Sequence, residues 1–141
     1  MGKINMGRVI LGGLLAGVVI NIGEFLLNEP ILGKQWVAAM EALNLPPIGG
    51  SAMAVAFVAM SFGLGIAIVW LYAAIRPRYG AGPKTALYAG LAVWFFVWLW
   101  GFGGTAVIGL YPTKLVLITV IWGLFEVPIA AVVGAWPYKE E

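Results

Sequence analysis

Long apolar stretches separated by short charged or proline-containing segments dominate the pattern along the chain. The runs Val9–Leu27, Gly49–Ile75, Thr85–Thr113 and Leu115–Tyr138 contain only two charged residues, Glu24 and Glu126. Each run supplies the roughly 20 apolar residues that a bilayer-spanning helix needs, whereas strands of membrane barrels alternate and are about half as long. We therefore predict a single all-α integral membrane domain over residues 1–141, a four-transmembrane-helix bundle with spans at about 7–28, 50–75, 84–109 and 113–136.

Prolines and glycines mark the expected helix ends. Pro30 follows the first span, Arg76-Pro77 is expected to end the second, and Gly82-Pro83 opens the third. Within the longest connection, segment 34–44 places apolar and polar residues on opposite faces at helical spacing. This segment predicts a short amphipathic helix on the outer side, lying on the membrane face or over the bundle.

Composition narrows the possible chemistry. Hydrophobic residues make up 62% of the chain and charged residues 10%, against about 25% charged in an ordinary soluble domain. The sequence contains no Cys and no His, and all six of its acidic residues are Glu. Thiolate metal sites, histidine bases and Ser-His-Asp triads are therefore excluded, and we expect no catalytic residue, no metal and no nucleic-acid partner. No motif identifies a cofactor.

The basic residues predict the orientation. Six of them (Lys3, Arg8, Arg76, Arg78, Lys84 and Lys139) fall on one side of the predicted spans, and Lys34 and Lys114 fall on the other. Lys and Arg accumulate in cytoplasmic loops. We therefore expect a multi-pass protein of the bacterial inner (cytoplasmic) membrane with both termini cytoplasmic.

Small residues and aromatic residues predict how the helices pack. Gly13-x-x-x-Gly17 in the first span and Ala130-x-x-x-Gly134 in the fourth are spaced for close helix–helix approach. Trp94 and Trp98, four residues apart in the third span, share one face. Two interpretations of this aromatic face stay open, namely packing between helices and a flat surface for a quinone or a pigment.

Glu24 and Glu126 are the main candidates for function, because carboxyl groups inside a bilayer usually face the bundle interior. Counted along the helices, Glu24 lies roughly 24 Å beyond Arg8 and Glu126 about 18 Å beyond Lys114. Other polar side chains accompany them in the same spans. They are Asn21 and Asn28 in the first span, Ser61 in the second and Thr119 in the fourth. Pro128 is expected to bend the fourth helix beside Glu126 and to free the Leu124 carbonyl.

Two functions remain open at this point. The polar groups predict an outward-facing site that binds or transports a proton, a cation or a small solute. Alternatively, the carboxyl groups only hold the bundle together through hydrogen bonds. In that case the chain is a non-catalytic accessory subunit of a respiratory or photosynthetic membrane complex, in contact with a quinone or pigment. Both alternatives fit a lipid-embedded homo-oligomer or a subunit of a larger assembly.

Overall fold

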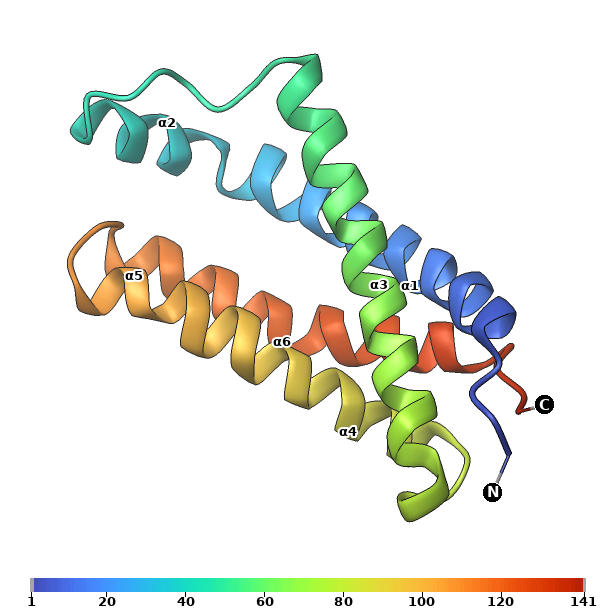
Figure 1. Ribbon diagram of the computed structural model, residues 1–141. Helices are drawn as coiled ribbons and strands as arrows, with labels where there is room; N and C mark the ends of the chain where they lie inside the picture. Colours follow the sequence, from blue (N-terminus) through green and yellow to red (C-terminus); the bar gives the residue numbers. More distant parts are fainter. Residues whose placement is uncertain (1, 141) are drawn as a thin grey trace.

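The computed structural model describes residues 2–140, and this part of the chain is helical with no strand. Four of its helical stretches are long and apolar enough to cross a membrane, namely Met6–Ile31, Ser51–Tyr79, Pro83–Val107 and Thr113–Ala135. The first stretch is α1 (Met6–Leu26) followed by η1 (Leu27–Ile31), and the second is α3 (Ser51–Tyr79). The third consists of α4 (Pro83–Trp94), η2 (Phe95–Phe102) and α5 (Gly103–Val107), and the fourth is α6 (Thr113–Ala135). Helix α2 (Gly33–Ala42) lies between the first two stretches. The predicted four-helix membrane bundle is confirmed (Figure 1).

Two helix ends and the winding of two spans differ from the sequence prediction. Pro30 was expected to follow the first span but lies inside it, in η1. The second spanning helix was expected to end at Arg76-Pro77, but α3 continues through Pro77 to Tyr79 and ends at Gly80, whose φ of 88° suits glycine. The first and third spans each change from α to π winding, at η1 and at η2. A π turn adds a residue to the helical repeat and so re-aims the side chains that follow it, which the 3.6-residue pattern does not reveal.

Helix α6 runs antiparallel along α1, η1 and α2. Near the chain termini the main-chain N–H of Asn5 contacts the Tyr138 hydroxyl at 3.3 Å, and further along Gly12 faces Gly134. At the other end Ala39 of α2 packs in one apolar cluster with Leu115 and Val116 of α6. The amphipathic segment predicted at 34–44 therefore forms α2 over the end of the bundle that lies away from the chain termini, where Trp36 packs against Phe102 and Tyr111. This end is called the outer end and the end with the termini the inner end, as names of position within the bundle only.

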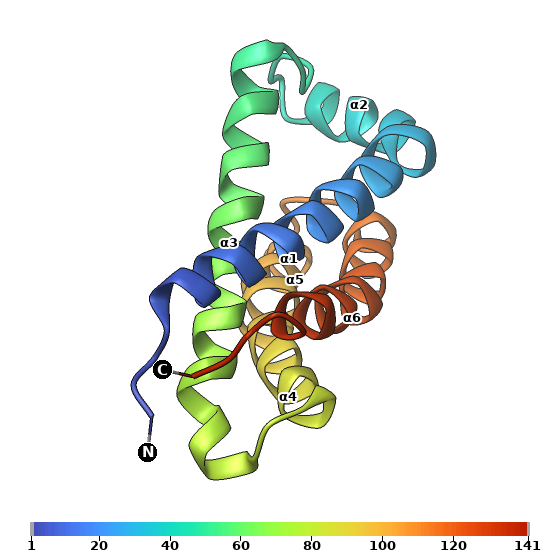
Figure 2. The same ribbon diagram turned by 90° about the vertical axis from the view of Figure 1, so that its right-hand side faces the viewer.

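Helix α3 crosses α1 and then leaves the bundle (Figures 1 and 2). The crossing is very close, because a Cβ at Gly13 would overlap the Ile66 backbone and one at Gly17 would overlap Phe62. Beyond Phe62, every residue from Ser51 to Met60 is exposed. The outer half of α3 therefore stands apart, and the tightest packing lies in the inner half of the molecule.

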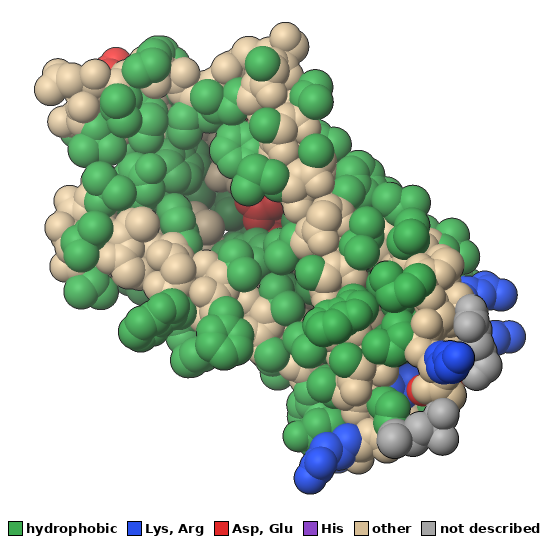
Figure 3. All heavy atoms as spheres, viewed as in Figure 1, with side chains coloured by type: hydrophobic (Ala, Val, Ile, Leu, Met, Phe, Trp, Pro, Cys, Tyr) green, Lys and Arg blue, Asp and Glu red, His purple; other side chains and the backbone are tan. Residues whose placement is uncertain are grey.

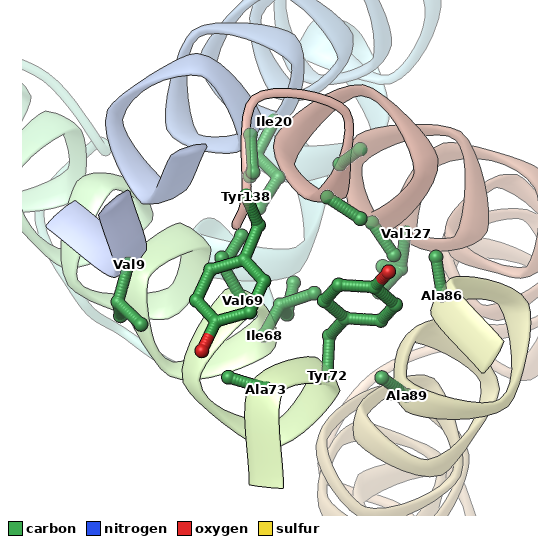
Figure 4. Close-up of a cluster of buried hydrophobic side chains, with 14 of the residues drawn as sticks. Val9, Ile20, Ile68, Val69, Tyr72, Ala73, Ala86, Ala89, Val127 and Tyr138 are labelled. Atoms are coloured by element: carbon green, nitrogen blue, oxygen red, sulfur yellow. The ribbon is translucent and has the colours of Figure 1, made fainter. Parts of the chain in front are cut away.

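The inner end holds the main core and both described ends of the chain. Tyr72 and Tyr138 meet edge to face, with their ring centroids 5.7 Å apart, among small side chains of α3, α4 and α6 (Figure 4). Arg76 lies over the Tyr138 ring and pairs with Glu140 at 3.4 Å. Blue side chains gather at this end in Figure 3, so a group of basic residues and both described ends of the chain lie at the same end of the bundle, whereas Lys34 and Lys114 belong to elements of the other end.

Candidate functional site

Glu24 of α1 and Glu126 of α6 meet inside the bundle. The two residues are about a hundred positions apart in the sequence, but Glu24 directly follows Gly23, which faces the Glu126 carboxyl group. Glu126 is only 6% exposed, whereas Glu24 is half-buried. The approach depends on Gly23, because a Cβ there would overlap the Glu126 carboxyl group. Antiparallel packing of α6 on α1 thus places the two glutamates at one level in the membrane.

A chain of hydrogen bonds from η1 and α2 holds the Glu24 carboxyl group in position. Asn28 Nδ2 donates to Glu24 Oε2 at 2.9 Å and to the Glu24 main-chain carbonyl at the same distance. The indole nitrogen of Trp36 in turn donates to Asn28 Oδ1 at 2.8 Å. Asn28 belongs to the π turn η1, which joins α1 to the start of α2, so this turn sets the position of Asn28 relative to Glu24 and Trp36. Asn28 and Trp36 are therefore positioning residues for Glu24.

The Glu126 carboxyl group is held from its own helix. The indole N–H of Trp122, one turn earlier on α6, donates to Glu126 Oε1 at 3.3 Å. The second oxygen, Oε2, is buried, and so is Oε1 of Glu24; neither has a hydrogen-bond donor among residues 2–140. Each carboxyl group thus has one oxygen fixed by a donor and one oxygen still unsatisfied, which is a costly arrangement for buried acceptors.

The surroundings of the carboxyl pair contain no compensating positive charge within the described residues. The Lys and Arg residues of the spanning helices lie in their terminal turns, as with Arg8 in α1 and Lys114 in α6. The space-filling view shows a red carboxyl group at the bottom of a hollow with mostly green walls (Figure 3). This hollow opens between the outer half of α3, the α1–η1–α2 rod and η2. The pair is therefore buried in the bundle but lies beside an open space.

The structure brings only some of the predicted polar residues to the pair. Asn28 joins it directly, whereas Asn21 donates to the Gly17 carbonyl and Thr119 to the Leu115 carbonyl, each within its own helix. Ser61 lies on α3 beside Phe62, at the last close contact with α1. The group of polar residues at the pair is thus smaller than the set of residues that the sequence suggested.

The predicted packing and aromatic residues lie mainly inside the bundle. Trp94 donates its indole N–H to the Val120 carbonyl at 2.9 Å, and Trp98 covers Gly123 of α6. Ala130 is fully buried, and a Cβ at Gly134 would meet Val69 and Ala16.

Three residues of the site were not predicted from the sequence. Gly23 makes room for the Glu126 carboxyl group, Trp122 donates to it, and Trp36 fixes Asn28. Only Trp122 carried a usable signal, since it precedes Glu126 by four residues and therefore shares its helix face. Gly23 and Trp36 act across elements whose register the sequence does not specify. No known protein family matches this chain, and neither a curated protein nor a solved structure matches it.

Proposed function

We propose that this membrane protein binds a proton or a monovalent cation at the Glu24–Glu126 pair, in a site that faces the outer side of a cytoplasmic membrane, and that both chain termini lie in the cytoplasm. The observation that carries the proposal is the presence of two buried, unsatisfied carboxyl oxygens on glutamates that lie at the same level of the α1–α6 contact. Both are acceptors, so only a positively charged or hydrogen-donating species satisfies them together.

Electrostatics favours one proton or one cation for the pair. Two negative charges in contact repel strongly where the dielectric is low, and the basic side chains of the spanning helices lie in the terminal turns. One proton on the pair leaves one negative charge and gives one carboxyl group an O–H with which to donate a hydrogen bond. A monovalent cation that displaces this proton leaves the total charge of the site unchanged, so the site supports exchange between proton and cation.

The Glu126→Gln variant separates this function from a purely structural role. The amide oxygen still accepts from Trp122, and the amide NH₂ donates to Glu24, so the bundle keeps its contacts. Proton exchange at the pair requires the carboxyl group itself. We expect Glu126→Gln to fold normally and to lose the carboxyl band that changes with pH in infrared difference spectra of the protein in lipid nanodiscs.

Glu41→Gln is the matched control, because Glu41 is exposed on α2, away from the pair. Its spectrum is expected to keep the band that Glu126→Gln loses. The proposal is abandoned if the wild-type protein shows no pH-dependent carboxyl band that either Glu24→Gln or Glu126→Gln removes. That result would support the alternative of a structural subunit in a larger membrane complex, in which the carboxyl groups only hold helices together.

A further inference from the structure

We propose that the cation bound by this pair is a hydrophobic organic cation that reaches Glu24 and Glu126 sideways from the outer leaflet, between the outer half of α3 and η2. This inference rests on the proposed function, since it names the chemical class of the cation and its route. Three features carry it: the position at which α3 leaves the bundle, the chemistry of the walls and the groups at the end of the route.

The point of divergence places the opening beside the pair. Gly17 on α1 makes its contact with Phe62, and past this contact the residues of α3 are exposed. Glu24 lies seven residues further along α1, which is about 10 Å of helix. The carboxyl pair therefore lies just beyond the helix crossing, and the hollow in Figure 3 leads to a red carboxyl group from the side of the bundle.

The walls of this opening are apolar and aromatic. From Ser51 to Met60, Ser51 is the only residue of α3 with a polar side-chain atom. The neighbouring helix η2 carries exposed aromatic side chains, Phe95, Phe96 and Trp100, and the walls of the hollow in Figure 3 are mostly hydrophobic. A small hydrated ion passing here loses its water without gaining replacement ligands, which is costly. An organic cation instead makes apolar contacts along the route, as ligands do in mostly apolar pockets with few polar groups.

The groups at the end of the route suit a delocalised positive charge. The unsatisfied oxygens of Glu24 and Glu126 attract a cation and repel an anion. The half-buried indole of Trp122 adjoins the Glu126 carboxyl group through its N–H and so adds an apolar aromatic ring beside the site. Binding moves the shared proton from the carboxyl pair to the aqueous phase, so one proton leaves for each monovalent cation bound.

Helical periodicity identifies a residue that narrows the opening. Val58 precedes Phe62 by one turn and so lies on the face of α3 that points towards α1. Met60, two residues after Val58, lies on the opposite face. Both are exposed, so a larger side chain at either position costs little packing. Val58→Trp therefore tests the route, and Met60→Trp is its matched control.

The experiment measures equilibrium binding of radiolabelled tetraphenylphosphonium to the protein in lipid nanodiscs, together with proton release in weakly buffered solution. We expect saturable binding, about one proton released per cation, weaker binding at lower pH, and loss of both signals in Glu126→Gln. Tetramethylammonium, Na⁺ and K⁺ should release no proton. Val58→Trp should weaken tetraphenylphosphonium binding at least about tenfold, while Met60→Trp binds as the wild type.

The outcomes separate this inference from the proposed function. Proton release by Na⁺, K⁺ or tetramethylammonium but not by tetraphenylphosphonium overturns the inference and leaves the proposed function standing. Equal binding by Val58→Trp and Met60→Trp overturns the lateral route. If no cation releases a proton although the infrared band of the pair still titrates, the site binds protons alone, and the inference is wrong. Absence of that band removes the proposed function as well.

Discussion

The close crossing of α1 and α3 predicts a large effect for the smallest possible substitution. In Gly13→Ala, the added Cβ would lie 2.8 Å from the Ile66 main-chain nitrogen and closer still to Ile66 Cα. These are backbone atoms, so no rotamer change relieves the overlap and the two helices must move apart. Overpacking of this kind typically costs 1–3 kcal/mol, in order of magnitude.

The helix propensity of alanine opposes this cost. Replacing glycine by alanine inside a helix favours the folded state by about 1 kcal/mol. The net expectation for Gly13→Ala is therefore a loss of stability of about 1–2 kcal/mol. Gly63→Ala supplies the matched control, because no other described residue, outside the backbone of its own helix, lies within 4 Å of a Cβ built there. That variant should gain up to about 1 kcal/mol from propensity alone.

The assay is thermal unfolding of both variants and the wild type in the same detergent, with circular dichroism used to monitor the loss of helix. We expect the midpoint of Gly13→Ala to fall by several degrees, and that of Gly63→Ala to stay equal or rise slightly. The difference between the two variants reports the helix–helix overlap, since propensity cancels. Equal midpoints for the two alanine variants would refute the close α1–α3 crossing and, with it, the position of the outer opening.

Three further predictions concern other parts of the molecule. Reporter fusions at the C-terminus and in α2 should show the C-terminus in the cytoplasm and α2 outside, and the reverse activities would overturn the orientation. Gly123→Ala should lower the unfolding midpoint, because its Cβ would overlap the Trp98 ring, and an unchanged midpoint would mean that this ring is free to move. Glu140→Gln should cost at most about 1 kcal/mol, because its ion pair with Arg76 is partly exposed, and a larger loss would show that the pair anchors the C-terminus.

The spanning helices were predictable because the bilayer imposes a length and a composition that few other constraints override. The run from Gly49 to Ile75 contains no charge. In lipid such a segment must form a helix, because its backbone N–H and C=O groups have to bond to one another. The boundary at Pro77 was wrong because α3 continues for two residues past the proline, although Pro77 has no N–H to bond the Ala73 carbonyl, and the positive φ of Gly80 is the actual stop. The π segments η1 and η2 were not predictable, since they insert a residue without altering hydrophobicity.

The candidate site was predictable in its residues but not in its pairing. Glu24 and Glu126 are conspicuous as carboxyl groups in apolar runs, and Asn28 shares a helix face with Glu24. Their meeting depends on the antiparallel register of α1 and α6, which Gly12, Gly134 and neighbouring small residues set by allowing close approach. Counting along each helix from its basic end gave two different depths, whereas the register places both carboxyl groups at one level.

Glycine residues, which have no side chain, determine where the helices of this protein pack closely and where they leave an opening. On α1, Gly13 and Gly17 allow α3 to cross closely. Gly23 leaves the space that the Glu126 carboxyl group occupies. Because α3 crosses α1 at a large angle, as Figures 1 and 2 show, the two straight helices separate again within a few turns of their contact. The outer half of α3 consequently cannot cover the carboxyl pair. The same close contact that stabilises the inner half thus leaves Glu24 and Glu126 beside an opening, which is the arrangement that the proposed cation site requires.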